Sequence, residues 1–299
     1  MELMTQLRAD QTRIAKALAD YAAQWPPYGA LKDAMSYSLL SGGKRIRPAL
    51  TLAVCRLFGG REEDALPFAC GLEMVHTYSL IHDDLPCMDD SPLRRGKPSV
   101  HAAFGEDMAL LAGDALLTLA FEVMLRADNR QAIPAESVLA AAFTLAKRAG
   151  YAGMVGGQVV DVEKDGCFMD EDMLYFVHKN KTSALIEAAL MTGAVLAGAD
   201  EKQAAVMEQY GTDIGLAFQI QDDILDVIGD QEKLGKPVHS DEKNEKTTAV
   251  SVYGIDVCRQ KVKDYTDRGI EALEALDIPG KEHQKFLVEL MKSLVGREM

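Results

Sequence analysis

The sequence predicts an all-α protein, a bundle of about ten helices around a central cavity. Apolar residues recur at helical spacing in nearly every segment, and alanine, which favours helices, is spread along the whole chain. Signals for β-strands are almost absent. No linker separates two halves of the chain, so we expect a single domain over residues 1–299.

Proline and glycine divide this helical pattern into segments. The amino terminus, residues 1–20, mixes acids, bases and glutamines at helical spacing. The expected breaks are at residues 25–27, 41–43, 58–60, 92–98, 129–134, 150–157, 166, 198, 229–246 and 278–280. Two of the helices, residues 73–85 and 209–227, are apolar except at their acidic ends. We expect them at the centre of the bundle, with the functional site between them.

Composition excludes several classes of function. The net charge of −14 opposes non-specific binding to nucleic acid, which needs a basic surface. The five cysteines are scattered without CxxC spacing, so we expect neither disulfides nor a zinc site, and a cytoplasmic location. The amino terminus lacks the apolar core of a secretion signal. The longest apolar stretch, residues 115–125, falls short of the ~20 residues of a membrane span, so we expect none.

Two acidic motifs are the most informative feature. In the second, Gln219, Asp222, Asp223 and Asp226 share one face of a helix. The first motif begins at Asp83 and continues through Asp89, which would lie about 240° further around a regular helix. Pro86 disfavours a continued helix, so we expect a break near Leu85 that returns Asp89 to Asp83. Carboxylates gathered at one cavity predict a site for Mg²⁺ and phosphate.

Basic clusters complement these carboxylates. Lys44, Arg45 and Arg47 follow two glycines at an expected helix start, and Arg94 and Arg95 follow the first acidic motif. Arginine forks and lysine charges suit diphosphate groups, although the spacing is not that of a nucleotide-binding P-loop. A long polar loop, residues 229–248, carries further lysines. Each motif alone is also typical of a solvated surface, but their occurrence together indicates a common site.

With these motifs, the chain resembles the trans-isoprenyl diphosphate synthases along its whole length, and among them the bacterial-type farnesyl diphosphate synthases. The matching stretches are Gly42 to Pro48, Glu73 to Pro86, Leu93 to Gly96, Gly156 to Gln158 with Asp161, Lys179 to Thr182, and Phe218 to Asp226. The resemblance implies an isoprenoid-synthase bundle. It also implies head-to-tail condensation of isopentenyl diphosphate with dimethylallyl and geranyl diphosphates through an allylic carbocation.

The resemblance also implies a role for each matching residue. Three Mg²⁺ ions would be held by Asp83, Asp89 and Asp222, and Asp84, Asp223 and Asp226 would orient these ligands. The allylic diphosphate would contact Arg94, Lys181, Thr182, Gln219 and Lys236, and the isopentenyl diphosphate would contact Lys44, Arg47, His76 and Arg95. Gln158 would line the reacting pocket. A homodimer with one site in each subunit is implied as well.

Product length is expected to depend on Tyr78, five residues before Asp83, with Ser79 beside it. In the family, a bulky aromatic residue at this place resembles a floor that stops growth at fifteen carbons, which favours a farnesyl product. Synthases of geranylgeranyl or longer diphosphates share the metal motifs and stay open as an alternative. A terpene cyclase is disfavoured by the repeated DDxxD motif, and a regulatory subunit by the presence of both motifs.

Overall fold

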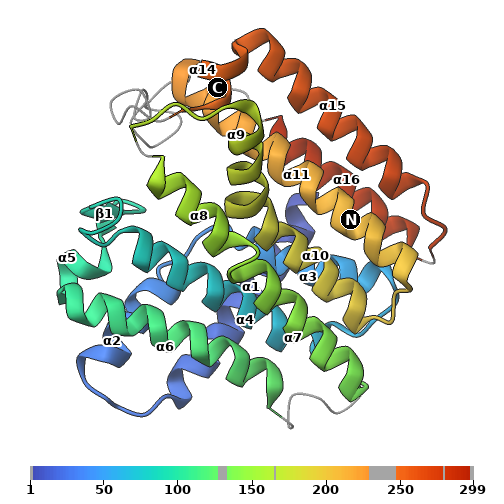
Figure 1. Cartoon of the computed structure of the whole chain (residues 1–299). Helices are drawn as coiled ribbons and strands as arrows, with labels where there is room; N and C mark the ends of the chain where they lie inside the picture. The colour runs from blue at the N-terminus through green and yellow to red at the C-terminus, as the bar shows by residue number, and fades with distance from the viewer. Residues whose placement is uncertain (1–2, 127–132, 165, 229–246, 279, 297–299) are drawn as a thin grey trace.

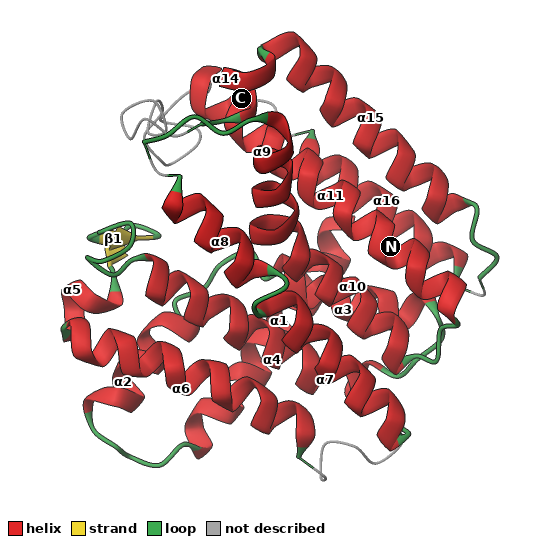
Figure 2. Cartoon of the chain, in the orientation of Figure 1, coloured by secondary structure: helices red, strands yellow, loops and turns green. Residues whose placement is uncertain are grey.

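The computed structural model describes residues 3–126, 133–164, 166–228, 247–278 and 280–296, and these are helical almost throughout (Figures 1 and 2). The first half contains α1 (Leu3–Gln24), α2 (Ala30–Leu39), α3 (Ile46–Leu57), α4 (Glu62–Asp83), α5 (Val100–Phe104), α6 (Glu106–Leu125) and α7 (Ala135–Ala149). The second half contains α8 (Met154–Glu163), α9 (Glu171–Val177), the π-helix η2 (His178–Ser183), α10 (Ala184–Leu196), α11 (Glu201–Ile228), α14 (Ala249–Tyr253), α15 (Ile255–Glu274) and α16 (Lys281–Val295). The predicted all-α class is confirmed.

One short hairpin interrupts the helices in the described chain. Strands β1 (Leu93–Arg94) and β2 (Lys97–Pro98) pair in antiparallel fashion and lie beside α5 (Figure 2). Arg95 and Gly96 form the turn, and both have positive φ values of 53° and 74°. Such values are those of tight two-residue hairpin turns.

The two helices expected at the centre are longer than the sequence predicted. α4 begins eleven residues earlier, at Glu62, where Glu62, Glu63 and Asp64 form an acidic first turn that suits the positive end of the helix dipole. α11 begins at Glu201 and not at residue 209. α4 packs against α3 and α6, and α10 packs against α3, α7 and α11. Most residues of α4 are buried, as expected of a central helix.

The break predicted at residues 150–157 is partly wrong, because α8 already begins at Met154. Gly157 therefore lies inside a helix. A Cβ atom at this position would lie 2.4 Å from the backbone nitrogen of Lys181 in η2. The glycine is explained by this close approach of two segments and not by a turn.

The described apolar side chains form two cores. The larger contains residues of α1 to α4, α6, α7, α10, α11 and α16. The smaller lies around α9, α14 and α15 and includes Ile220 and Ile224 of α11. Because Tyr210 and Ile214 of the same helix belong to the larger core, α11 connects the two.

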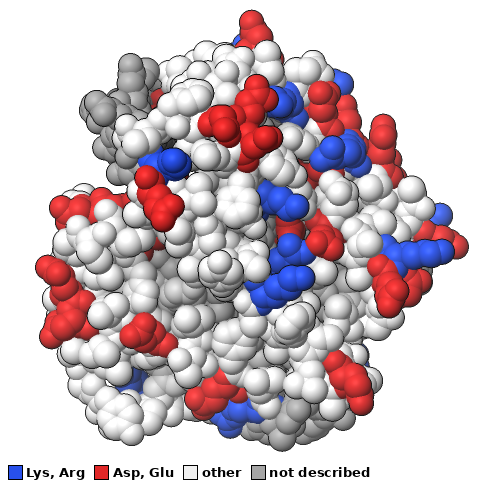
Figure 3. Space-filling view, in the orientation of Figure 1, with Lys and Arg blue, Asp and Glu red and all other residues white. Residues whose placement is uncertain are grey.

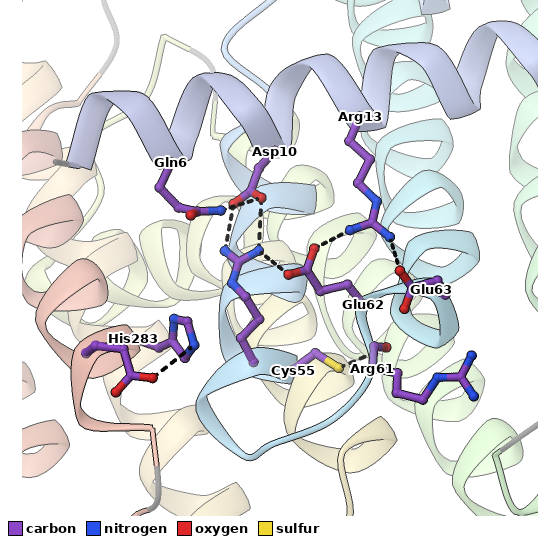
Figure 4. A network of polar contacts seen from close by, with 10 residues as sticks. Gln6, Asp10, Arg13, Cys55, Arg61, Glu62, Glu63 and His283 are labelled. Atoms are coloured by element: carbon purple, nitrogen blue, oxygen red, sulfur yellow. Dashed lines mark hydrogen bonds and ion pairs between the residues drawn. The ribbon is translucent and has the colours of Figure 1, made fainter. Parts of the chain in front are cut away.

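α1 is attached to the bundle by buried ionic contacts (Figure 4). Asp10 accepts two hydrogen bonds from the Arg56 guanidinium of α3, at 2.9 and 2.7 Å. Arg56 also contacts Glu62 at 3.2 Å, and Glu62 pairs with Arg13 of α1. Fork-to-carboxylate geometry of this kind fixes the direction as well as the distance between helices.

α6 is, within the described residues, the one helix long and apolar enough to cross a membrane, judged by length and composition alone. The expectation that this stretch is too short was therefore wrong, since the helix runs from Glu106 to Leu125. In the structure α6 packs against α2, α4, α5 and α7. A packed helix of a bundle also passes such a test, and the absence of a membrane span stays a prediction.

Candidate active site

The first acidic motif forms where α4 ends. The helix stops at Asp83, and the backbone N–H of Asp89 donates to the carbonyl of Asp83 at 2.9 Å. The predicted break near Leu85 is thus confirmed, and it brings Asp89 back toward Asp83. Asp83 is half-buried, Asp84 is buried, and Asp89 is exposed.

Burial makes the charge of Asp83 costly. Desolvation raises the pKa of Asp83 to about 6, with further contributions from Asp89 and Asp84 and opposing ones from Lys181 and Arg94. Gln158 of α8 donates to Asp83 Oδ1 at 3.0 Å. A nearby cation would stabilise the charged form of this partly desolvated carboxylate.

Asp84 points to a different partner. Its carboxylate accepts from Arg94 Nε at 3.1 Å to each oxygen and from Arg94 Nη2. Burial of Asp84 and this fork-like pairing hold β1 against the end of α4. That Asp84 orients the Mg²⁺ ligands stays a prediction. In this structure Arg94, expected to contact a diphosphate, is paired with Asp84.

The second acidic motif lies on α11. Asp222 is half-buried, whereas Asp223 and Asp226 are buried. Gln219 Nε2 donates to Asp223 Oδ1 at 3.0 Å, as expected for residues on one face of a helix. Asp223 Oδ2 accepts from the backbone N–H of Ala249 at 2.7 Å, so Asp223 also fixes the start of α14.

The π-helix η2 places Lys181 and Thr182 between the two motifs. Lys181 Nζ donates to Asp161 Oδ2 at 2.6 Å, and Asp161, Asp83 and Asp89 all raise the pKa of the lysine against the effect of burial. Thr182 Oγ1 donates to Gln219 Oε1 at 2.9 Å. Short π-helical segments are frequent at functional sites, because the extra residue displaces side chains from the regular pattern.

Three adjoining cavities meet at these residues. The first, the apolar cavity of about 480 Å³, is lined by Tyr78, Ser79, Asp83, Gln158 and valines of α8, among others. The second, the basic cavity of about 450 Å³, is lined by Lys44, Arg47, His76 and Arg95 with apolar neighbours. The third, the polar cavity of about 180 Å³, is lined by Asp161, His178, Gln219 and Asp223.

Shared residues connect the cavities. Lys181 and Thr182 line both the apolar and the polar cavity. Arg47 and His76 line both the apolar and the basic cavity. The arrangement offers an apolar space with a cationic group at each of two junctions, which suits two anionic ligands with apolar tails.

Within the described residues, the basic cavity contains one arginine, Arg47, with an unsatisfied buried donor. Arg47 Nη1 lies 3.5 Å from His76 Nε2, and Arg47 Nε is buried without a hydrogen-bond partner among the described residues. Burial and the neighbouring Arg47 guanidinium hold the pKa of His76 well below its usual value. The imidazole is therefore neutral at pH 7, and Nε2 can accept from Arg47. An anion bound here would satisfy Arg47.

The remaining predicted site residues have different surroundings. Lys44 is exposed at the edge of the basic cavity, and the Arg95 guanidinium donates to Gly42 O and to Ser41 Oγ, the latter at 3.3 Å. Asp226 is buried on α11. Lys236 lies outside the described residues.

Two supporting contacts were missed by the sequence analysis. Arg45, grouped with the phosphate-holding bases, turns inward and pairs with the buried Glu73 of α4 while donating to Leu39 O. Its φ of 46° places it in the left-handed region just before α3. Asp161, quoted only as part of a matching stretch, is the partner of Lys181. Neither contact has a local signal, because each joins residues far apart in the chain.

The donor set suits Mg²⁺ better than a cation that needs a complete protein cage. Among the described residues, no three histidine, cysteine, aspartate or glutamate side chains gather closely enough to hold a metal ion by themselves. Mg²⁺ uses one or two carboxylates and completes its shell with water and substrate phosphates. The buried charge of Asp83 beside Asp89 is consistent with that mode of binding.

A model of the polyprenyl synthetase family matches residues 29–277. The chain belongs to the polyprenyl synthetase family. The farnesyl diphosphate synthase of Bacillus subtilis is 43% identical over 99% of this chain and 98% of the relative. The farnesyl diphosphate synthase of Geobacillus stearothermophilus is 42% identical over 92% of each chain. The family expected from the sequence motifs is confirmed.

Other polyprenyl synthetase relatives agree in fold and differ in product. The geranylgeranyl diphosphate synthase of Cyanophora paradoxa is 50% identical over 75% of this chain and 74% of its own. A crystal structure of an FPP/GFPP synthase from Zymomonas mobilis superimposes with a TM-score of 0.86 at 33% identity, covering 98% of both chains. The isoprenoid-synthase-type bundle is thereby confirmed.

Proposed function

We propose that the protein is a farnesyl diphosphate synthase, a prenyltransferase that joins isopentenyl diphosphate head to tail with dimethylallyl and then geranyl diphosphate. The observation that carries this proposal is the joining of the three cavities. An apolar space that is lined by Tyr78 adjoins both the Arg47–His76 junction and the Lys181–Thr182 junction. Two diphosphates and one growing prenyl chain fit this division.

The allylic diphosphate is proposed to bind at the Lys181–Thr182 junction. Lys181, Thr182, Gln219 and Arg94 would contact it, with Lys236 as a further candidate. Asp83, Asp89 and Asp222 would hold Mg²⁺, while Asp84, Asp223, Asp226 and Gln158 orient the ligands and the pocket. Bound Mg²⁺ would supply positive charge that stabilises the departing diphosphate.

The isopentenyl diphosphate is proposed to bind in the basic cavity through Lys44, Arg47, His76 and Arg95. Breaking the allylic C–O bond leaves a carbocation and an anionic diphosphate, whose charge Lys181 can stabilise as it develops. The isopentenyl double bond attacks the cation, and loss of a proton completes the product. The valines of α8 and Tyr78 keep water from the cation. The departing diphosphate accepts the proton.

A twenty-carbon or longer product is the second candidate. The geranylgeranyl diphosphate synthase that is 50% identical to this chain favours this candidate. Both products need the same ionisation and condensation steps, so the same site residues serve either one. The size of the cavity beyond Tyr78 distinguishes the two candidates.

The assembly is proposed to be a homodimer of single-domain subunits in the cytoplasm. α11 contributes to both cores, which supports one domain. Apolar side chains stand exposed on α6 and α7, including Leu110, Leu111, Leu139 and Phe143. Figure 3 shows a largely uncharged area over the middle of α6, to the left of and below a group of Lys and Arg side chains near the centre of the view. A second subunit would cover such an apolar surface.

Product analysis tests the function directly. Purified protein is incubated with Mg²⁺, isopentenyl diphosphate and dimethylallyl diphosphate, and the products are measured by mass spectrometry, with a chelator as control. We expect a fifteen-carbon diphosphate that disappears with the chelator. A longer product would replace the farnesyl assignment with the second candidate. Folded protein without any condensation would favour a regulatory subunit.

A further inference from the structure

The ring of Tyr78 rests on a neighbour that the proposed mechanism does not use. His82 lies one turn further along α4, and the two rings meet edge to face, with centroids 5.7 Å apart and planes at 79°. Both residues line the apolar cavity. The position of the Tyr78 ring, and so the depth of the cavity, depends on where His82 is held.

His82 is held by α6. Its Nε2 lies 3.0 Å from the carbonyl oxygen of Leu110, and 3.9 Å from Asp114 Oδ1. Because a carbonyl oxygen only accepts, Nε2 is the protonated nitrogen and donates to Leu110. No α6 residue is among the described residues that line the apolar cavity, whereas His82, which α6 holds, is one of them.

Gly113 of α6 makes this contact possible. A Cβ atom at position 113 would lie 2.0 Å from His82 Nε2 and 2.3 Å from Cδ2. Gly113 is buried within a regular helix, where glycine is less favourable than alanine. The imidazole occupies the space of the missing side chain, and a methyl group there would displace the whole ring.

We propose that His82 and Gly113 are positioning residues for Tyr78, so that α4 and α6 together determine the length of the product. The imidazole, fixed in the notch at Gly113 and bonded to Leu110, supports the phenol ring that ends the cavity. Once the imidazole is removed or displaced from this notch, the phenol ring can turn into the space that it leaves, and the cavity gains depth for a further isoprene unit. This inference rests on the proposed prenyl diphosphate synthase activity.

The test compares product ratios of His82→Ala, Gly113→Ala and the double variant with those of the unmodified protein. We expect each single variant to raise the ratio of twenty-carbon to fifteen-carbon product about fivefold, the factor that corresponds to loss of a ring contact worth about 1 kcal/mol. The double variant should match His82→Ala, because the methyl group at position 113 then has no ring to displace. A general loosening of the fold would instead give additive effects.

Two further variants make the test decisive. His101→Ala replaces a histidine of α5 that bonds to Ser99 and lies outside the cavity, and it should keep the original product ratio. His82→Gln keeps a donor for Leu110 but has no ring, so it should also lengthen the product, and it replaces His82→Ala if that variant does not fold. Unchanged ratios in folded His82 and Gly113 variants would overturn the inference while leaving the synthase activity in place. An unmodified protein that forms no condensation product would instead contradict the proposed function.

Discussion

Tyr78 is the residue on which the proposed product length depends. It is buried and lines the apolar cavity, one and a half turns from Asp83 on the same helix. Regular helix geometry turns these two side chains about 140° apart, yet both border the cavity. The cavity is broad enough to extend from the carboxylate at the end of α4 to the phenol ring deeper in the bundle.

Truncating this ring should lengthen the product. In Tyr78→Ala the phenol is lost, and the apolar cavity can extend into the space that the ring occupied. We expect products of twenty carbons or more to exceed the fifteen-carbon product, measured by mass spectrometry after incubation with both substrates. Tyr78→Phe keeps the ring and serves as the control. A fifteen-carbon product from the alanine variant would remove Tyr78 as the floor.

The buried imidazole of His76 should make stability depend on pH. Its pKa is lowered in the folded state by burial and by Arg47. The unfolded chain takes up a proton below about pH 6.5, and the folded chain does not, so the stabilising contribution is lost as pH falls. One such histidine lowers the free energy of unfolding by about 1 kcal/mol when the pH falls from 7 to 5.5.

Denaturant unfolding of the substrate-free protein at these two pH values measures the effect. The loss of unfolding free energy on acidification should be smaller by that amount in His76→Gln than in the unmodified protein. His178, whose pKa is also lowered by burial, to about 4, is present in both proteins and cancels. Equal losses in the two proteins would show that His76 takes up its proton in the folded state.

At the scale of elements, some helix ends could be predicted from the sequence and others could not. The end of α4 at the first acidic motif was predictable, because Pro86 acts locally on the residue before it. The start of α8 was not, since Gly157 serves a contact with η2 that is distant in sequence. A glycine can mark either a turn or a close contact between two helices, and a single sequence does not distinguish these two roles.

The attachment of α1 gives an element-scale prediction. Asp10→Asn removes the charge opposite Arg56 while both side chains stay buried, and breaking such a pair costs about 3 kcal/mol. Asp20→Asn on the same helix breaks an exposed pair with Lys16, which is worth about 0.5 kcal/mol at most. Denaturant unfolding should show this contrast. Similar losses for both variants would mean that water reaches the Asp10 pair.

At the scale of the whole molecule, the sequence motifs predicted family and fold better than they predicted the contacts of individual residues. The carboxylates and bases could be assigned to one site because the family pattern links segments that lie far apart in the chain. The basic cluster alone grouped Arg45 with the ligand-binding bases, whereas its guanidinium pairs with Glu73. Charge type is visible in a sequence, but the partner that neutralises each charge depends on tertiary packing.

At this scale we predict that the protein is a homodimer whose interface includes α7. Leu139→Glu and Phe143→Glu place charges on α7 at side chains that are 62% and 67% exposed in the single chain. Each variant should sediment as a monomer of 32.6 kDa, whereas the unmodified protein should sediment at twice that mass. Val257→Glu, on α15 and 47% exposed, should stay dimeric. Dimers in all three variants would locate the interface elsewhere.

The π-helix between α9 and α10 has a consequence for how the chain can vary in length. It accommodates one residue more than an α-helix would over the same rise, and each residue corresponds to about 100° of rotation. Deleting one residue from His178–Ser183 would either turn Lys181 away from the two acidic motifs or rotate the buried face of α10 out of the larger core. A one-residue insertion or deletion within η2 would therefore change the angle between Lys181 and the buried face of α10, whereas one in a surface loop would leave that angle unchanged.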